Sequence, residues 1–313
     1  MQRLVKKLLV GIAVPGAALL ILVLILNSFY VKTDYYKNLN GVRKFHNLPE
    51  HITAANFGNS HSSNGFDWSV YSDKDCANMA LASQTLVYDE AIFDYYYDKF
   101  DRDSTIIVVV SFRTLYEQEK IHSDKVKRYY QFLDSKHIMD WNVKNSVLYS
   151  QIPILGNFTN AVLEFLDLRG NATKDNPDYK NMTEKNRQDI GAKRAELFIK
   201  DIGSLQLGIQ YDALVKIIDK CKQKQMQLVL VTMPTTPYFY ENFTDEFYNK
   251  FYSDIEDICE LYDRTVYLDY TKDERFVTNL DIFRDQDHMN ASGAELFTLT
   301  FIEDLKKQGI SIG

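Results

Sequence analysis

The segment from Leu8 to Val31 contains no charged residue. As an α-helix it would be about 36 Å long, at about 1.5 Å per residue, which is enough to cross the hydrocarbon core of a membrane. Arg3, Lys6 and Lys7 precede it, and positive charge stays on the cytoplasmic side of a membrane helix. We therefore expect residues 1–31 to form a single-pass cell-membrane anchor, with the N-terminus in the cytoplasm and the body outside.

A cleaved signal peptide is the alternative, because it also combines a basic start with an apolar stretch. The apolar run is long for a signal peptide, and no small-x-small cleavage site follows Leu26. Phe29 and Tyr30 stand where interfacial aromatic residues are expected. These features favour the anchor. We then expect residues 32–50 to form a polar juxtamembrane linker.

Charge and cysteine content exclude several classes of function. Residues 1–37 carry a net charge of +4 within a total of −7, so the remainder carries −11. An acidic body does not favour nucleic-acid binding, which needs basic surface against phosphates. Cys76, Cys221 and Cys259 show no metal-binding spacing, and a small odd number argues against a disulfide framework. A Cys221–Cys259 bridge stays open as an alternative to free thiols, and we expect neither a metal nor an organic cofactor.

Buried strand-like runs alternate with helical periodicity through the body of the chain. The expected strands are Ile52–Phe57, Asn78–Leu81, Ser104–Ser111, Gln227–Met233 and Thr265–Tyr270. The expected helices are Leu86–Phe100, Tyr211–Gln225, Asp245–Tyr262 and Ala291–Gln308. This alternation predicts an α/β fold, a three-layer α/β/α sandwich around a mostly parallel five-stranded sheet.

Residues 112–205 do not fit the alternation, since they are rich in Tyr, Asn, Lys and Asp. We interpret them as a partly helical insertion in a domain of residues 51–313, lying over the carboxyl edge of the sheet. It would serve as a lid or a partner surface, or it is a solvated excursion without a function.

A serine follows the first expected strand in the segment Asn56-Phe57-Gly58-Asn59-Ser60-His61-Ser62. Gly58 allows a sharp turn after the strand, and the turn would present Ser60 beside a helix N-terminus at the edge where active sites of such sheets lie. A nucleophilic serine needs this exposure and nearby N–H groups. By itself the segment also fits an ordinary turn or helix cap.

A base and a carboxylate occur together near the C-terminus, in Asp285-Gln286-Asp287-His288. A serine nucleophile needs a base, and the base needs an orienting carboxylate. Asp285 is the preferred carboxylate, because the side chain of Asp287, adjacent to His288, is expected to diverge from it. The alternative is that His288 merely caps the helix expected from Ala291. His61 is expected to support the site and not to act as the base.

The two segments together resemble the SGNH (GDSL-type) hydrolase superfamily, in which the serine follows the first strand and a DxxH motif precedes the last helix. The residues Gly58-Asn59-Ser60-His61, the run 78–85 (NMALASQT) and the run 287–294 (DHMNASGA) are similar to a narrower group. Its members are anchored proteins that work beside membrane-bound O-acyltransferases, such as the D-alanyl transfer protein of teichoic-acid D-alanylation and proteins of alginate and peptidoglycan O-acetylation. This resemblance implies a triad of Ser60, Asp285 and His288.

The sequence departs from the secreted members of the superfamily at the oxyanion hole. Ala82-Ser83 stands near the second block, where a Gly is usual, and Ser111-Phe112-Arg113 follows the third strand, where an Asn is usual. The resemblance then implies a hole built from N–H groups of Ser60 and Ser83, with Asn59 or Ser111 nearby. Arg113 is a candidate for holding an anionic substrate, or it forms a surface salt bridge.

Three functions are consistent with these residues. The leading expectation is an extracytoplasmic serine O-acyltransferase or acyl esterase acting on a cell-envelope glycan or teichoic acid, with a membrane-bound O-acyltransferase as partner. The second is a non-catalytic assembly or glycan-binding subunit of such a system, which the missing Asn favours. The third is a lipid or peptide-type serine hydrolase.

Overall fold

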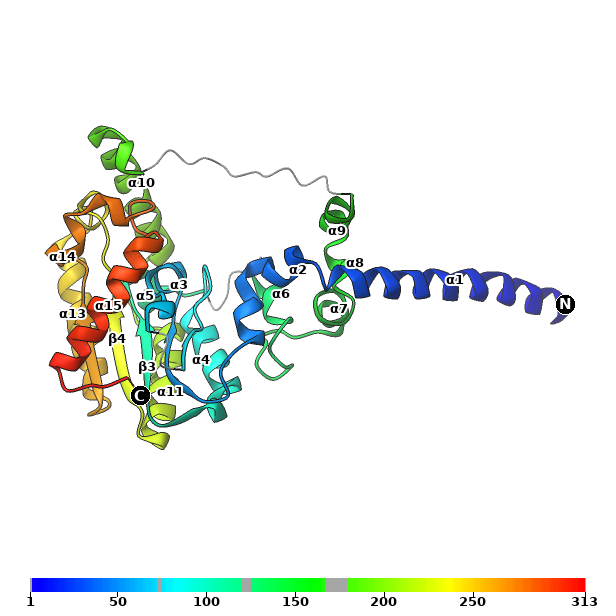
Figure 1. The fold of residues 1–313 in the computed structure, drawn as a ribbon, viewed down its shortest axis with the longest axis horizontal. Helices are drawn as coiled ribbons and strands as arrows, with labels where there is room; N and C mark the ends of the chain where they lie inside the picture. Colours follow the sequence, from blue (N-terminus) through cyan, green and yellow to red (C-terminus); the bar gives the residue numbers. More distant parts are fainter. Residues whose placement is uncertain (1, 72–74, 120–124, 167–178, 313) are drawn as a thin grey trace. The chain divides into compact units, whose positions relative to one another are not determined.

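The chain divides into two compact units in a computed structural model, which describes residues 2–71, 75–119, 125–166 and 179–312 (Figure 1). One unit joins residues 1–46 with residues 126–173, and the other joins residues 47–125 with residues 174–313. The expected insertion of residues 112–205 therefore belongs partly to each unit.

The larger unit contains a five-stranded parallel sheet with the strand order β2-β1-β3-β4-β5. Its strands are β1 (Ile52–Phe57), β2 (Cys76–Asn78), β3 (Phe100–Val109), β4 (Gln227–Thr232) and β5 (Thr265–Asp269). The predicted α/β class and five parallel strands are confirmed. The short β2 begins two residues earlier than predicted, and its last residue, Asn78, is in register with Asn56 of β1.

Helices cover both faces of the sheet. On one face, Ile107, Val109, Val229 and Val231 form a buried cluster with Phe297, Phe301 and Leu305 of α15 (Ala291–Lys307). Side chains alternate along strands, so Ile106, Val108, Leu228 and Leu230 face the other side. There α11 (Ile209–Lys224) packs on β3 and β4 and against α4 (Leu86–Tyr95), and α13 (Asp245–Glu260) packs on β5.

The remaining helices of this unit follow strands in the chain or belong to the segments that connect strands. They are α3 (Ser60–Gly65), α5 (Phe112–Tyr116), α10 (Glu184–Ile202), α12 (Pro237–Tyr240) and α14 (Glu274–Val277). α4 ends at Tyr95, before the predicted Phe100, because a short 3-10 turn at Tyr97–Lys99 leads into β3.

The smaller unit is helical and starts with α1 (Gln2–Tyr30). Gly11–Tyr30 has a mean hydropathy of 2.4 and is long enough to cross a membrane, as an anchor or as a signal sequence. The expected linker at 32–50 contains α2 (Asp34–Asn38) and a 3-10 helix at Leu39–His46. The unit also contains α6 (Val126–Tyr129), α7 (Val143–Ser146), α8 (Pro153–Gly156) and α9 (Phe158–Phe165).

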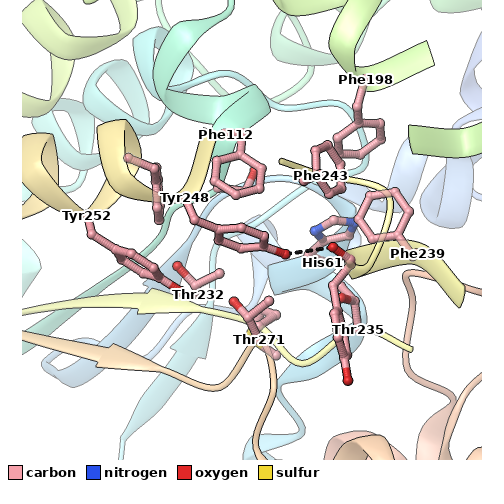
Figure 2. Close-up of a pocket in the computed structure, with 14 residues that line it drawn as sticks. His61, Phe112, Phe198, Thr232, Thr235, Phe239, Phe243, Tyr248, Tyr252 and Thr271 are labelled. Atoms are coloured by element: carbon pink, nitrogen blue, oxygen red, sulfur yellow. Dashed lines mark hydrogen bonds between the residues drawn. The ribbon is translucent and has the colours of Figure 1, made fainter. Parts of the chain in front are cut away.

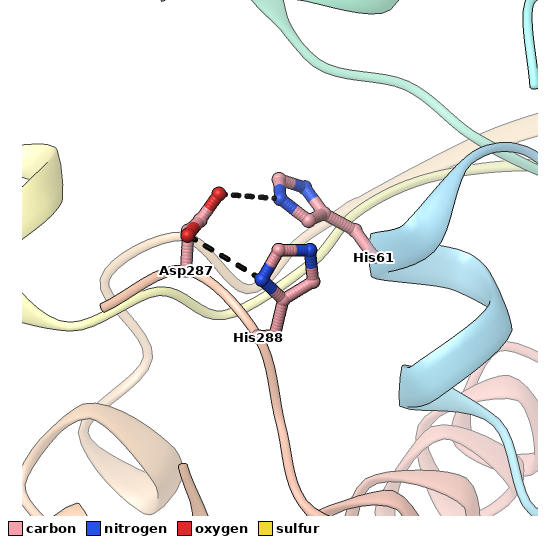
Figure 3. Close-up of side chains that lie close together, drawn as sticks. All are labelled: His61, Asp287 and His288. Atoms are coloured by element: carbon pink, nitrogen blue, oxygen red, sulfur yellow. Dashed lines mark hydrogen bonds and ion pairs between the residues drawn. The ribbon is translucent and has the colours of Figure 1, made fainter. Parts of the chain in front are cut away.

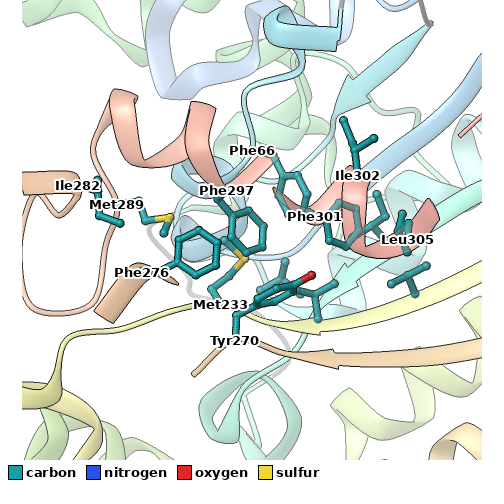
Figure 4. Packing of buried hydrophobic residues seen from close by; sticks show 14 of the residues in the cluster. Phe66, Met233, Tyr270, Phe276, Ile282, Met289, Phe297, Phe301, Ile302 and Leu305 are labelled. Carbon is teal, nitrogen blue, oxygen red and sulfur yellow. The ribbon is translucent and has the colours of Figure 1, made fainter. Parts of the chain in front are cut away.

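Phe297 is the centre of the core between α15 and the sheet (Figure 4). Its ring lies 5.0 Å from that of Tyr270, 5.2 Å from Phe66 and 5.5 Å from Phe276, measured between centroids, and the side chain is fully buried. These contacts fix the start of α15, and with it the loop that carries His288.

We predict that Phe297→Ala lowers the free energy of unfolding by about 3–5 kcal/mol, because it opens a cavity in a close-packed core. Urea unfolding of the full chain in detergent measures this. Leu299→Ala, on the exposed side of the same helix, is the control and should change stability by no more than about 0.5 kcal/mol. Equal effects of the two substitutions would contradict this account of the core.

Candidate active site

A sharp turn at the carboxyl end of β1 positions Ser60. Gly58 has a φ of +128°, which a residue with a side chain rarely adopts, and its N–H donates to Asp89 Oδ1 at 2.9 Å. Ser60 is the first residue of α3, whose cap is Asn59, with its Oδ1 accepting from the His61 N–H. The strand order reverses between β1 and β3, and ligands of open α/β sheets bind at such switch points.

His288 joins Ser60 to Asp285. Its Nε2 lies 2.8 Å from Ser60 Oγ, and its Nδ1 lies 2.9 Å from Asp285 Oδ1. The same carboxylate oxygen accepts the backbone N–H groups of Asp287 and His288, which fixes Asp285 within its loop. Asn290, and not His288, caps α15. The structure therefore brings together the three residues that the sequence singled out, in triad geometry.

Asp287 forms a second network behind the imidazole of His288 (Figure 3). Its side chain is fully buried, and Oδ2 lies 3.1 Å from His61 Nε2 and 3.0 Å from Arg194 Nε. Oδ1 accepts from Gln286 Nε2 at 2.9 Å and lies 3.4 Å from His288 Nδ1. Asp285 is thus the nearer carboxylate to His288, but Asp287 does not diverge from it as expected.

The carboxylates control the charge of the histidines. Burial favours neutral imidazole at His288, but Asp285 and Asp287 outweigh it and raise the pKa of His288 to about 9. Burial would also raise the pKa of Asp287, but hydrogen bonds from His288 and His61 hold that pKa well below its usual range. Burial lowers the pKa of His61 despite its bond to Asp287. His61 is therefore a neutral donor to Asp287, in keeping with a supporting position.

A pocket of about 100 Å³ opens beside Ser60. Its lining consists of Asn59, Ser60, His61, Ser83, Gln84, Arg113, Glu117, Arg194 and Phe198. Ser83 has a φ of +55° and is the third residue of a turn closed by a hydrogen bond from the Gln84 N–H to Leu81 O. Such a backbone conformation favours glycine, and members of the superfamily that the sequence resembles usually have a Gly near this position.

Hydrogen-bond donors are available in this pocket. Among the residues that the structure describes, the backbone N–H groups of Ser60 and Ser83 have no acceptor, and neither does the side-chain Nδ2 of Asn59. Donors that are already in place beside a nucleophile can stabilise a developing oxyanion. Three of the predicted residues therefore meet at the pocket with unused donors.

Ser111 lies elsewhere than the resemblance implied. Its hydroxyl caps α5 by accepting from the Thr114 N–H, and it lines a separate aromatic pocket of about 30 Å³ (Figure 2). His61 and Phe198 line both pockets, but Ser60 lines only the first. Ser111 does not line the Ser60 pocket, and its side chain is already engaged in the cap.

Arg113 and Arg194 bring positive charge to the Ser60 pocket. Arg113 Nη2 lies 3.2 Å from Asp201 and 3.5 Å from Glu117. Arg113 therefore forms a salt bridge, which was the alternative to its holding an anionic substrate. Both guanidinium groups lie over the ring of Phe198, at 5.4 Å for Arg113 and 4.8 Å for Arg194. Sequence reasoning missed Arg194, because it lies in α10 within the atypical segment and belongs to no motif.

His61, Asp287 and His288 also form a cluster with the spacing of metal ligands, within 4.8 Å of one another. However, the Arg194 guanidinium already supplies a positive charge at 3.0 Å from Asp287 Oδ2, and a bound cation would repel it. His288 Nε2 is engaged with Ser60. A charge-balanced hydrogen-bond network explains these positions better than a metal centre.

No protein-family model and no curated protein matches the chain. Among solved structures, a Streptococcus pneumoniae protein described provisionally as a platelet activating factor is 9% identical, with a TM-score of 0.38 over 95% of this chain and 97% of that one. A Bacteroides fragilis protein described provisionally as an acylhydrolase is 8% identical, with a TM-score of 0.39 over 88% and 99%. Likenesses this distant assign no activity, and the fold class stands on the sheet itself.

We predict that Ser60 reacts with an organophosphonate faster as the pH rises, with the midpoint of the rise at about pH 9 and a plateau above it. His288 accepts a proton only when it is neutral, which it becomes above its raised pKa of about 9. Asp285→Asn should move the rise to lower pH and lower the plateau, because a carboxylate that raises this pKa is lost. Labelling rates across the pH range measure both effects.

Asp281→Asn is the matched control, since Asp281 is an exposed carboxylate upstream in the same stretch. It should leave the profile unchanged. A wild-type rate that stays constant between about pH 6 and 10 would contradict the role of His288 as the base.

Proposed function

We propose that this chain is a membrane-anchored serine enzyme of the SGNH type that transfers or hydrolyses acyl groups through an acyl-enzyme on Ser60. The observation that carries the proposal is the continuous chain of contacts from Ser60 Oγ to His288, at 2.8 Å, and from His288 to Asp285, at 2.9 Å. A nucleophile, a base and an orienting carboxylate in this order are the requirements for activating a serine hydroxyl.

In the proposed reaction, Ser60 Oγ attacks the carbonyl carbon of an acyl donor while His288 Nε2 takes the hydroxyl proton. The tetrahedral oxyanion accepts hydrogen bonds from the pocket donors of Ser60, Ser83 and Asn59. Collapse breaks the bond to the leaving group, which receives the proton from His288. A hydroxyl of the acceptor, or water, then attacks the acyl-enzyme with His288 again as base, and Ser60 is regenerated.

The size of the pocket supports a short acyl group such as acetyl. Pockets for drug-sized ligands occupy about 300–1,000 Å³, whereas the Ser60 pocket has about 100 Å³. A long lipid chain would need a larger apolar channel than either the Ser60 pocket or the aromatic pocket of about 30 Å³ offers. This favours acyl transfer or acyl esterase activity over lipid hydrolysis.

We further propose an anionic cell-envelope polymer, such as a teichoic acid or an acidic glycan, as the acceptor. Arg194 makes its one ion pair through Nε, so in the described part of the chain its two terminal nitrogens have no hydrogen-bond partner. Arg113 lines the same pocket. Guanidinium groups bind phosphate and carboxylate in bidentate geometry, so this pair suits such a polymer next to Ser60.

The setting that we propose is the outer side of the cell membrane, with α1 as the anchor and a membrane-bound O-acyltransferase as the acyl donor's source. The apolar segment Gly11–Tyr30 and the basic residues before it support this arrangement. The motifs around Ser60, Asn78 and His288 support the partner by their resemblance to proteins of O-acylation systems.

Ser60→Ala should abolish labelling by a fluorophosphonate and lower hydrolysis of p-nitrophenyl acetate by about a thousandfold or more, as removal of a triad serine does. Ser63→Ala, in the same helix and without a role in the triad, is the control and should keep both activities. In cells, Ser60→Ala should remove O-acyl groups from the envelope polymer. If the wild-type protein is not labelled, and if Ser60→Ala still supports O-acylation in cells, catalysis by Ser60 is contradicted. A non-catalytic assembly subunit is then favoured.

Arg113→Gln should raise KM for an anionic acceptor roughly tenfold to a hundredfold, because a charged hydrogen bond contributes about 1.5–3 kcal/mol. Hydrolysis of the neutral ester p-nitrophenyl acetate should change little. Lys193→Gln removes an exposed positive charge on α10 and should alter neither value. An unchanged KM in Arg113→Gln would contradict the anionic acceptor without affecting the role of Ser60.

A further inference from the structure

Helices α8 and α9 pack on the C-terminal end of α1 within the smaller unit (Figure 1). Ile154 and Ala161 are buried with Tyr30 of α1, and the partly buried Val23 packs against the same cluster. The Ile154 N–H donates to Asn27 Oδ1 at 3.1 Å. These contacts fasten α8 and α9 along one face of the last two turns of α1.

The outward face of the same two helices is apolar. The exposed side chains of this face are Leu155 (43% exposed), Phe158 (62%), Val162 (36%) and Leu166 (60%). Phe165 is 43% exposed, but its ring lies 6.4 Å from that of Tyr30 and so faces α1. From Phe158 onwards the side chains of the outward face recur at intervals of four residues, which places them in one stripe along α9. A contiguous apolar stripe of this kind marks an interaction surface.

The stripe is also almost free of charge. Residues 152–166 contain Glu164 as their single charged residue, whereas a quarter of the whole chain is charged. Trp141 precedes the helices and is 39% exposed, and tryptophan favours the interface between membrane and water. A surface with this composition has little to offer a polar or charged partner and suits hydrocarbon.

The attachment to α1 sets the level at which the stripe lies. The apolar segment Gly11–Tyr30 would be about 30 Å long as a helix, which equals the thickness of the hydrocarbon core. The contacts at Val23, Asn27 and Tyr30 occupy about 10 Å at its C-terminal end. If α1 spans the membrane, anything packed on these residues must lie within the adjoining leaflet or its headgroup region.

We propose that α8 and α9 form an interfacial membrane-binding element, whose stripe from Leu155 to Leu166 inserts into the lipid leaflet at the C-terminal end of α1. Interfacial helices bury their apolar face by about 5–10 Å in this way, which matches the length of α1 that the element covers. The inference rests on the proposed anchor. A second contact with lipid would stop the unit from turning freely about the axis of α1.

Depth-dependent fluorescence quenching tests the proposal on the full chain with Cys76, Cys221 and Cys259 replaced by Ala. The substitution Phe158→Cys introduces a single thiol, which is labelled with the polarity-sensitive dye NBD. The protein is then reconstituted in phosphatidylglycerol–phosphatidylethanolamine vesicles. Some vesicles contain lipid with a doxyl quencher high on its acyl chain. Leu19→Cys in α1 is the control for membrane insertion, and Leu299→Cys, an exposed leucine of α15, is the control for water.

The expected result is a blue-shifted emission and loss of fluorescence at Phe158 comparable to those at Leu19, with neither change at Leu299. A Phe158 label that behaves like the Leu299 label, while Leu19 is quenched, overturns the interfacial element and leaves the anchor intact. A Leu19 label in water overturns both. A blue shift of the Phe158 label without doxyl quenching means that a second copy of the chain covers the stripe. A blue shift that occurs only in native membranes means that another membrane protein covers it. Either result overturns the lipid assignment.

Discussion

The buried carboxylate of Asp287 is the constraint on which the arrangement of the candidate site depends. A buried charge is costly unless it is paired and hydrogen-bonded. Its partners come from three parts of the chain: His61 from α3, Arg194 from α10, and Gln286 and His288 from its own loop. The helix that begins with Ser60, the helix that lines its pocket and the loop with the base are therefore fixed to one another.

Much of the fold and the centre of the site could be predicted from sequence, because both depend on local patterns. Strands buried on both faces of a parallel sheet are continuous apolar runs, and the runs at β1, β3, β4 and β5 stand out from their surroundings. Ser60 follows the first run, and the spacing from Asp285 to His288 lets one loop hold both side chains. The class of fold followed from these elements, and the geometry of the three residues agrees with the motif.

The remaining features depend on contacts that spacing does not encode. Arg194 meets Asp287 across 93 positions of the chain, and no local pattern around Arg194 indicates that contact. Adjacent side chains usually diverge, so Asp287 was expected to point away from His288. It does not, because the loop is bent by a bridge between Phe283 and Met289. Sequence reasoning takes 112–205 as one insertion, whereas residues 126–166 belong to the unit that contains α1 and the residues on either side belong to the unit that contains the sheet.

The central claim is that Ser60 carries the acyl group between donor and acceptor. Acid quenching of the full chain shortly after it is mixed with p-nitrophenyl acetate, followed by peptide mass spectrometry, tests this most directly. The account predicts an acetyl adduct on Ser60 that disappears when acceptor is added before the quench. An adduct on another residue, or acetyl transfer without any adduct on Ser60, would contradict it.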